Sequence, residues 1–272
     1  MNSLKENIIL RSLKTEDGLP INNKRAVVDT ISNRVLGIVS PRYKIIKNED
    51  LLRKITPVVE ELGMRSEPQI TSTCNGAVTF IKFLSDKTTG EVAKGDVVQF
   101  GIEFFNSYNG SLSVGFHIIA LRLVCANGLV VPKSVREIRI RHTGCAEVLS
   151  LRNYLMEYSG QIEKVMELWK TWTRIIPKRE QLENFLGKLV GKRLGCDFIQ
   201  RYESLPVEQQ NLWQFYNILT YFLSHQMKPK KEEAVALRRF VKNETWTNRL
   251  TSVFVAKKTA RLGGRDANTN FI

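Results

Sequence analysis

The most constraining feature of this sequence is a change in the spacing of its apolar residues near residue 145. Before that point, short runs rich in β-branched and aromatic residues are separated by Gly, Asn, Asp and Pro, which is typical of strands joined by turns. After it, apolar residues recur every three or four positions, as in amphipathic helices. We therefore predict an α+β fold, in which an antiparallel β-meander in the N-terminal half packs with a long helix and is followed by a mainly helical C-terminal half.

This pattern divides the chain into a β-rich domain at 1–145 with one helix at 48–62, a helical region at 146–256 packed on it, and a basic, flexible tail at 257–272. The expected strands lie at 25–30, 35–40, 77–84, 97–105, 112–124 and 135–140. The expected later helices lie at 148–176, 179–194, 207–227 and 231–255, the last with a break at Asn243.

The helix within the β-rich domain has clear boundary signals. Asn48 is a favourable N-cap, Glu49 and Asp50 suit the positive end of the helix dipole, and Gly63 follows the apolar stripe. Because proline lacks an N–H and its ring clashes with the preceding turn, Pro57 should kink or break this helix.

Two Asn-Gly pairs indicate hairpin turns. At the first, a three-residue loop over 108–110 places Phe104 opposite Val114 and keeps the apolar residues of both strands on one face. The opposite face, open to solvent or to a partner, then holds Gln99, Glu103, Ser113 and His117. The second pair, Asn127-Gly128, predicts another tight turn.

The charge of the chain favours polyanionic partners. A formal net charge of +14 over 272 residues suits nucleic acid, because neutralising phosphates releases counterions, although a solvated basic surface would also explain it. The excess is concentrated near the C-terminus, where residues 224–265 hold eleven Lys and Arg against three Asp and Glu.

An arginine-bearing strand after the second Asn-Gly pair is the best candidate for contacts with phosphates, since guanidinium groups bind phosphate bidentately. An edge strand protected by charge is the structural alternative. Exposed aromatics stack on bases, and Phe105 and Tyr108 at the hairpin tip are candidates for that role, although either could instead cap the core. The predicted phosphate-binding residues are Arg122, Asn127, Lys133, Arg136, Arg139, Arg141, His142, Lys257, Lys258, Arg261 and Arg265.

No metal or cofactor site is predicted, and we expect no enzyme. His142 and Cys145 lack a second close pair of ligands, and no Cys–His arrangement resembles a nucleophilic site. The absence of a phosphate-binding Gly-rich motif disfavours an ATP-driven machine. Carboxylates at Asp86, Glu91, Asp96 and Glu103 could hold Mg²⁺ in a nuclease, but a solvated hairpin loop at 85–96 explains them adequately.

The chain also lacks the marks of export or membrane insertion. Its N-terminus has no signal-peptide apolar region, and no run of apolar residues reaches the length of a membrane span. The four cysteines are scattered and suggest a reducing compartment. We therefore expect a cytoplasmic protein with no membrane partner.

Four segments together carry a family resemblance: 36–52 (LGIVSPRYKIIKNEDLL), 122–131 (RLVCANGLVV), 140–144 (IRHTG) and 212–225 (LWQFYNILTYFLSH). They resemble a phage and plasmid family built on a domain of unknown function, over about residues 25–226. This resemblance implies a phage-related context, and no activity.

More distantly, the order of elements is similar to that of phage single-strand annealing proteins of the RecT, Redβ, ERF and Sak types. That similarity implies a homo-oligomer that holds single-stranded DNA in a basic groove without ATP, and it is an analogy at the level of the fold. The first hypothesis is therefore a single-stranded DNA-binding protein that acts as an accessory in annealing or recombination. The alternative is a protein-interaction module, either an inhibitor of host defence or an assembly factor, and a metal-dependent nuclease comes third.

Overall fold

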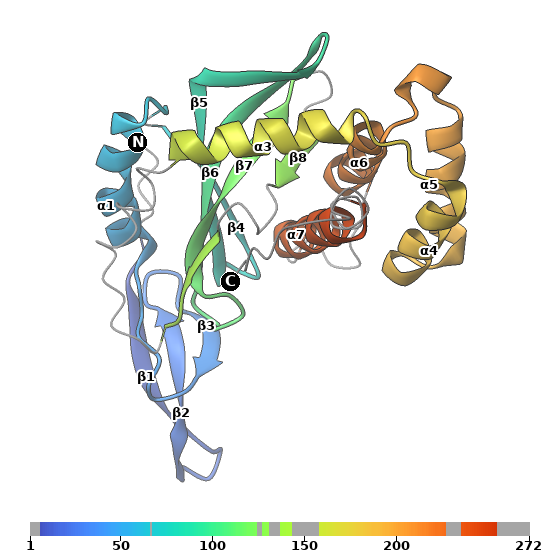
Figure 1. The fold of residues 1–272 in the computed structure, drawn as a ribbon. Helices are drawn as coiled ribbons and strands as arrows, with labels where there is room; N and C mark the ends of the chain where they lie inside the picture. The colour runs from blue at the N-terminus through green and yellow to red at the C-terminus, as the bar shows by residue number, and fades with distance from the viewer. Residues whose placement is uncertain are drawn as a thin grey trace, which may run out of the picture.

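A computed structural model of the chain describes residues 6–65, 67–123, 127–130, 137–142, 158–226 and 235–254. Two antiparallel sheets come first and a group of helices follows, which confirms the predicted α+β class (Figure 1). The smaller sheet projects from one end of the larger one, and the later helices lie to one side of the larger sheet.

The small sheet has the order β1-β2-β3 and the large sheet the order β4-β5-β6-β7-β8, with β9 also paired to β7. The strands of the small sheet are β1 (Ile8–Lys14), β2 (Pro20–Asp29) and β3 (Arg34–Val39). Those of the large sheet are β4 (Gln69–Thr73), β5 (Val78–Ala93), β6 (Asp96–Ser107), β7 (Val114–Arg122), β8 (Asn127–Val130) and β9 (Glu137–Ile140).

The strand predictions are corrected in number and extent, since the described residues form nine strands where six were predicted. Each predicted run overlaps a strand, although residues 124, 135 and 136 lie outside the described part of the chain. The sequence did not predict β1, β4 and β8; in β1 and β4, charged and polar residues interrupt the alternation. The predicted loop at 85–96 is wrong, since β5 continues to Ala93 and β6 begins at Asp96. A shift in register between Leu84 and Thr89 lets the strand continue through this polar segment.

The hairpin between β6 and β7 has a longer loop than predicted. Phe104 pairs with Phe116 and not with Val114, so the connection between these strands runs from residue 108 to 113. The observed register differs from the predicted one by two residues, so each side chain stays on its predicted face of the sheet. The apolar residues of both strands therefore still point into the core. His117 on the opposite face is nevertheless buried, at 3% exposed, which corrects the expectation that it is open to solvent.

The second Asn-Gly pair does not form the turn. Asn127 and Gly128 lie within β8, opposite Arg122 and Leu121 of β7. The connection therefore precedes them, at residues 123–126, most of which lie outside the described part of the chain.

The helix within the N-terminal half, α1 (Asn48–Glu61), confirms the predicted element and runs through Pro57 without a break. Asn48 is its first residue and does not cap it. The carboxylate of Glu6, 42 residues earlier, accepts hydrogen bonds from the Asn48 and Glu49 N–H groups at 2.7 and 3.4 Å. The Asn48 side chain instead bonds to Thr79 and Asn106, which fixes α1 to the large sheet.

The later helices divide differently from the prediction, and the predicted helical residues 148–157, 227, 231–234 and 255 lie outside the described part of the chain. The segment at 179–194 divides at Gly191, whose φ of +82° is unsuited to a helix, and Asn243 lies inside an unbroken helix. The elements are α3 (Tyr158–Trp172), α4 (Arg179–Leu189), α5 (Lys192–Glu203), a 3₁₀ turn η1 (Val207–Gln209), α6 (Leu212–Tyr221), a π-helical turn η2 (Phe222–Gln226) and α7 (Val235–Phe254).

An aromatic cluster joins these helices to the large sheet. Phe100 of β6 stacks on Trp169 of α3 with ring centroids 5.8 Å apart, and Trp169 contacts Trp213 of α6 at 5.2 Å. All three side chains are fully buried. The two halves of the chain therefore share one hydrophobic core, since burial of such large rings dominates packing energetics.

The contact between the two sheets generates the first prediction. A Cβ atom on Gly37 of β3 would lie 2.7 Å from the Asn109 Cβ in the β6–β7 loop and closer still to the Asn109 Cα. Gly37→Ala should therefore lower the free energy of unfolding by about 1–3 kcal/mol in a urea titration. Gly187→Ala in α4, where a Cβ meets nothing within 4 Å, should raise it by up to ~1 kcal/mol. A Gly37→Ala protein as stable as the parent would contradict this packing.

Candidate nucleic-acid interface

Arg122, which was predicted to contact phosphate, is held within the fold by a buried carboxylate. Its Nε and Nη2 atoms each lie 2.7 Å from an oxygen of Asp96, and its side chain is 14% exposed. The Trp213 Nε1–H donates a third hydrogen bond to the same carboxylate at 2.8 Å. The guanidinium is thus used to neutralise a buried carboxylate on the face of the sheet that packs against the helices.

His142 is a second predicted contact that the structure assigns to the fold. It is 6% exposed, its Nδ1 lies 3.1 Å from the Lys44 carbonyl oxygen, and its ring stacks on Tyr43 with centroids 4.5 Å apart. Burial lowers the pKa of His142 below its ordinary value. The ring is therefore neutral at pH 7 and offers no positive charge to a phosphate.

Arg139 and Arg141 of the arginine-bearing segment are exposed. The Arg139 guanidinium lies over the Phe105 ring, 5.4 Å from its centroid. A second basic segment, residues 42–44, lies next to this one, because the Lys44 N–H donates to the His142 carbonyl oxygen at 2.7 Å. Arg42 and Lys44 are both exposed. These side chains form a basic surface beside β9.

The two predicted stacking residues are unavailable to bases. Phe105 is fully buried on β6, and Tyr108 is 1% exposed in the loop that follows. The Tyr108 hydroxyl donates to Glu6 at 2.5 Å, and burial raises the pKa of this hydroxyl. Both rings pack in the core, which was the predicted alternative to base stacking.

Six predicted phosphate-binding residues lie outside the described part of the chain: Lys133, Arg136, Lys257, Lys258, Arg261 and Arg265. Asn127 is described as the first residue of β8. Two of the four cysteines, Cys74 and Cys196, are described and are free thiols.

The carboxylates considered for Mg²⁺ each have a protein partner. Asp86 pairs with Arg65, Glu91 accepts a hydrogen bond from the Gly95 N–H, and Glu103 lies 3.1 Å from the His117 Nε2. Burial alone would raise the pKa of Glu103, but the hydrogen bond to His117 and the electrostatic attraction of His117 and Lys82 together outweigh it and hold that pKa below its ordinary value. In the described ranges no three His, Cys, Asp or Glu side chains converge as a metal site would require.

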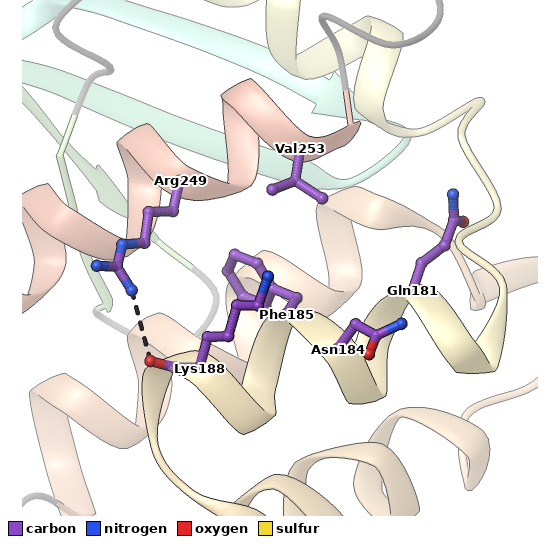
Figure 2. Close-up of a pocket in the computed structure, with 6 residues that line it drawn as sticks. All are labelled: Gln181, Asn184, Phe185, Lys188, Arg249 and Val253. Atoms are coloured by element: carbon purple, nitrogen blue, oxygen red, sulfur yellow. Dashed lines mark hydrogen bonds between the residues drawn. The ribbon is translucent and has the colours of Figure 1, made fainter.

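A groove that sequence reasoning missed lies between α4 and α7. Its volume is 670 Å³, and Figure 2 shows side chains from both helices converging on it. Arg249 crosses from α7 to donate a long hydrogen bond of 3.5 Å to the Lys188 carbonyl oxygen near the end of α4. The described lining residues are Gln181, Asn184, Phe185, Lys188, Arg249 and Val253.

The composition of this groove suits an anion. Among its described lining residues are two cations, Lys188 and Arg249, two amides, and no carboxylate. Glu183, on the same helix, is paired with Arg179 at 2.9 Å. The floor is apolar, because Phe185 is buried and meets Phe254 edge to face at 5.8 Å.

A second, smaller hollow of 430 Å³ lies at the corner between α4 and α5, and its lining includes the exposed Lys192 and Arg193 together with the acidic Asp197. We use the name helical basic groove for the first hollow, between α4 and α7.

Comparison with known proteins identifies the family. The family model described as a domain of unknown function, DUF932, matches residues 35–254. The chain belongs to the DUF932 family. No curated protein matches it, and no solved structure does.

The extent of the DUF932 match bears on the groove. The resemblance noted from sequence motifs ended near residue 226, whereas the match continues to 254 and includes α7. Both walls of the helical basic groove therefore lie within the DUF932 domain, while β1 and β2 precede it. No helix among the described stretches of this DUF932 protein has both the length and the apolar character needed to cross a bilayer.

The structural role of Arg122 can be tested by removing its side chain. Arg122→Ala would leave Asp96 buried without its cation and should cost about 3–5 kcal/mol of unfolding free energy in a urea titration. Arg53→Ala removes the arginine of an exposed pair with Asp50 and should cost less than ~1 kcal/mol. Equal costs for the two substitutions would show that the Asp96 pair is not the structural contact described above.

Proposed function

We propose that this protein binds single-stranded nucleic acid in the helical basic groove. The observation that carries the proposal is the pair of cations, Lys188 and Arg249, on facing helices above an apolar floor, with no carboxylate among the described lining residues. Two positive groups held across one groove suit a phosphate backbone, which supplies most of the affinity in sequence-tolerant binding.

The charge along the chain supports this location. Val253 lines the groove one residue before the end of α7, and Lys257, Lys258, Arg261 and Arg265 follow within twelve residues of it in the sequence. We propose that this C-terminal segment contributes further phosphate contacts.

The biological setting is part of the same proposal. The motif resemblance supports a role in phage or plasmid DNA metabolism in the cytoplasm, as an ATP-independent accessory of annealing or recombination that acts as a homo-oligomer. No nucleotide-binding Gly-rich motif occurs in the sequence, which agrees with action without ATP.

A second candidate function, a protein-interaction module, is favoured by a different surface. On β3, Val35 is 62% exposed and Ile38 is 57% exposed. A register shift in the pairing with β2 places them opposite Val28 and Ala26, so both point to the same face of the small sheet. An exposed apolar face of this kind is typical of a contact with another protein.

The proposal predicts salt-dependent binding that depends on the groove. In a fluorescence-anisotropy titration with labelled oligo-dT, log K should fall linearly with log salt concentration. Lys188→Ala/Arg249→Ala should weaken binding and reduce that slope by about 1.4, since each single-strand phosphate contact contributes about 0.7.

The matched control is Arg11→Ala/Lys24→Ala, which removes the same charge from exposed positions on the small sheet and should leave the slope unchanged. A reduced slope in Arg139→Ala/Arg141→Ala alone would move the interface to the basic surface beside β9. Absence of oligonucleotide binding by the parent protein at low salt would reject the proposed function and favour the protein-interaction module.

A further inference from the structure

Tyr221 differs from the other aromatic side chains in its exposure. It is 40% exposed, whereas every other Phe, Tyr or Trp side chain whose burial is described is buried or half-buried. Since Phe105 and Tyr108 lie in the core, they leave no stacking surface in the β-rich half among the described residues. A base seeking an aromatic face on the described surface would therefore meet Tyr221.

The local structure holds the Tyr221 ring in place. Tyr221 is the last residue of α6, and its ring centroid lies 4.7 Å from that of His225 in the π-helical turn η2. The end of this turn is fixed by a hydrogen bond of 2.8 Å from Arg201 of α5 to Gln226. Single π-helical turns occur frequently at functional sites, because they change the direction of side chains at the end of a helix.

The turn η2 is connected to the wall of the helical basic groove. Phe222, the neighbour of Tyr221, stacks on Trp246 of α7 with centroids 6.4 Å apart. The Lys242 ammonium lies 5.9 Å from the Trp246 ring centroid, and Lys242 is exposed. Trp246 and the groove residues Arg249 and Val253 are spaced three and four apart, so they share one side of α7.

Along α7, which packs on η2, exposed cations continue from Lys242 to Arg249 in the groove. At 1.5 Å per residue, Lys242 and Arg249 are about 10 Å apart along α7. An exposed ring at η2 and exposed cations on α7, which packs on η2, are the two components of sites that combine base stacking with phosphate contacts.

We infer that Tyr221 stacks on a nucleobase and that this contact makes the site prefer single strands over duplex. The inference rests on the proposed function and names the chemistry that the function uses. In a duplex the base faces are already stacked on each other, so Tyr221 would contact only unpaired bases. Cations in the groove would bind either form, because both carry phosphates.

The test compares labelled oligo-dT with a duplex of the same length at one salt concentration. Tyr221→Ala should weaken oligo-dT binding about tenfold, leave duplex binding unchanged, and leave the salt slope unchanged because no charge is lost. Tyr221→Trp should retain the affinity of the parent protein. Tyr221→Leu keeps a bulky apolar group but lacks an aromatic face, and it should behave like Tyr221→Ala.

Ile176→Ala is the control, since it truncates another exposed apolar side chain, 75% exposed, and should change neither affinity. Oligo-dT binding by Tyr221→Leu that equals that of the parent would overturn the inference while leaving the proposed function intact. An equal loss on both nucleic acids would also overturn it, because it would indicate a structural role. A parent protein that binds neither nucleic acid would reject the proposed function and the inference together.

Discussion

The fold depends most on one buried carboxylate, that of Asp96. It accepts hydrogen bonds from the Arg122 guanidinium on β7 and from the Trp213 indole on α6, so a single group joins two strands to the helical half. Removing either charge would leave the other uncompensated in a medium of low dielectric, which is costly. The position of α6 follows from this contact, and with it the position of η2 and of α7, which packs on η2 through Trp246 and Phe222.

This arrangement separates the basic residues into two groups with different roles. In the β-rich half, Arg122 neutralises Asp96 and His142 is buried neutral against Tyr43, so both stabilise the fold. In the helical half, Lys188 and Arg249 face each other across the groove, and Lys242 is exposed along the same helix. Exposed positive charge lies on the helices, around Arg139 and Arg141, and also on the small sheet, and the net charge of +14 alone could not distinguish these locations.

The sequence predicted what depends on local periodicity and missed what depends on tertiary partners. The spacing of apolar residues predicted α1 and the face of β6 that points into the core, because each pattern depends only on the geometry of a single helix or strand. The role of Asp96 could not be predicted, since Trp213 lies 117 residues away and the carboxylate stands at the end of a polar stretch that resembles a loop. For the same reason the groove was missed, as Lys188 and Arg249 come together only after α4 and α7 have packed.

The central claim is that nucleic acid binds on the helical half of this DUF932 protein. Hydrogen–deuterium exchange of the full chain, with and without saturating oligo-dT, tests it directly because exchange reports protection element by element. We predict slower exchange in α4 (Arg179–Leu189) and α7 (Val235–Phe254), with no change in β9 (Glu137–Ile140). Protection confined to β9 and residues 42–44, or no protection in any element, would contradict the account.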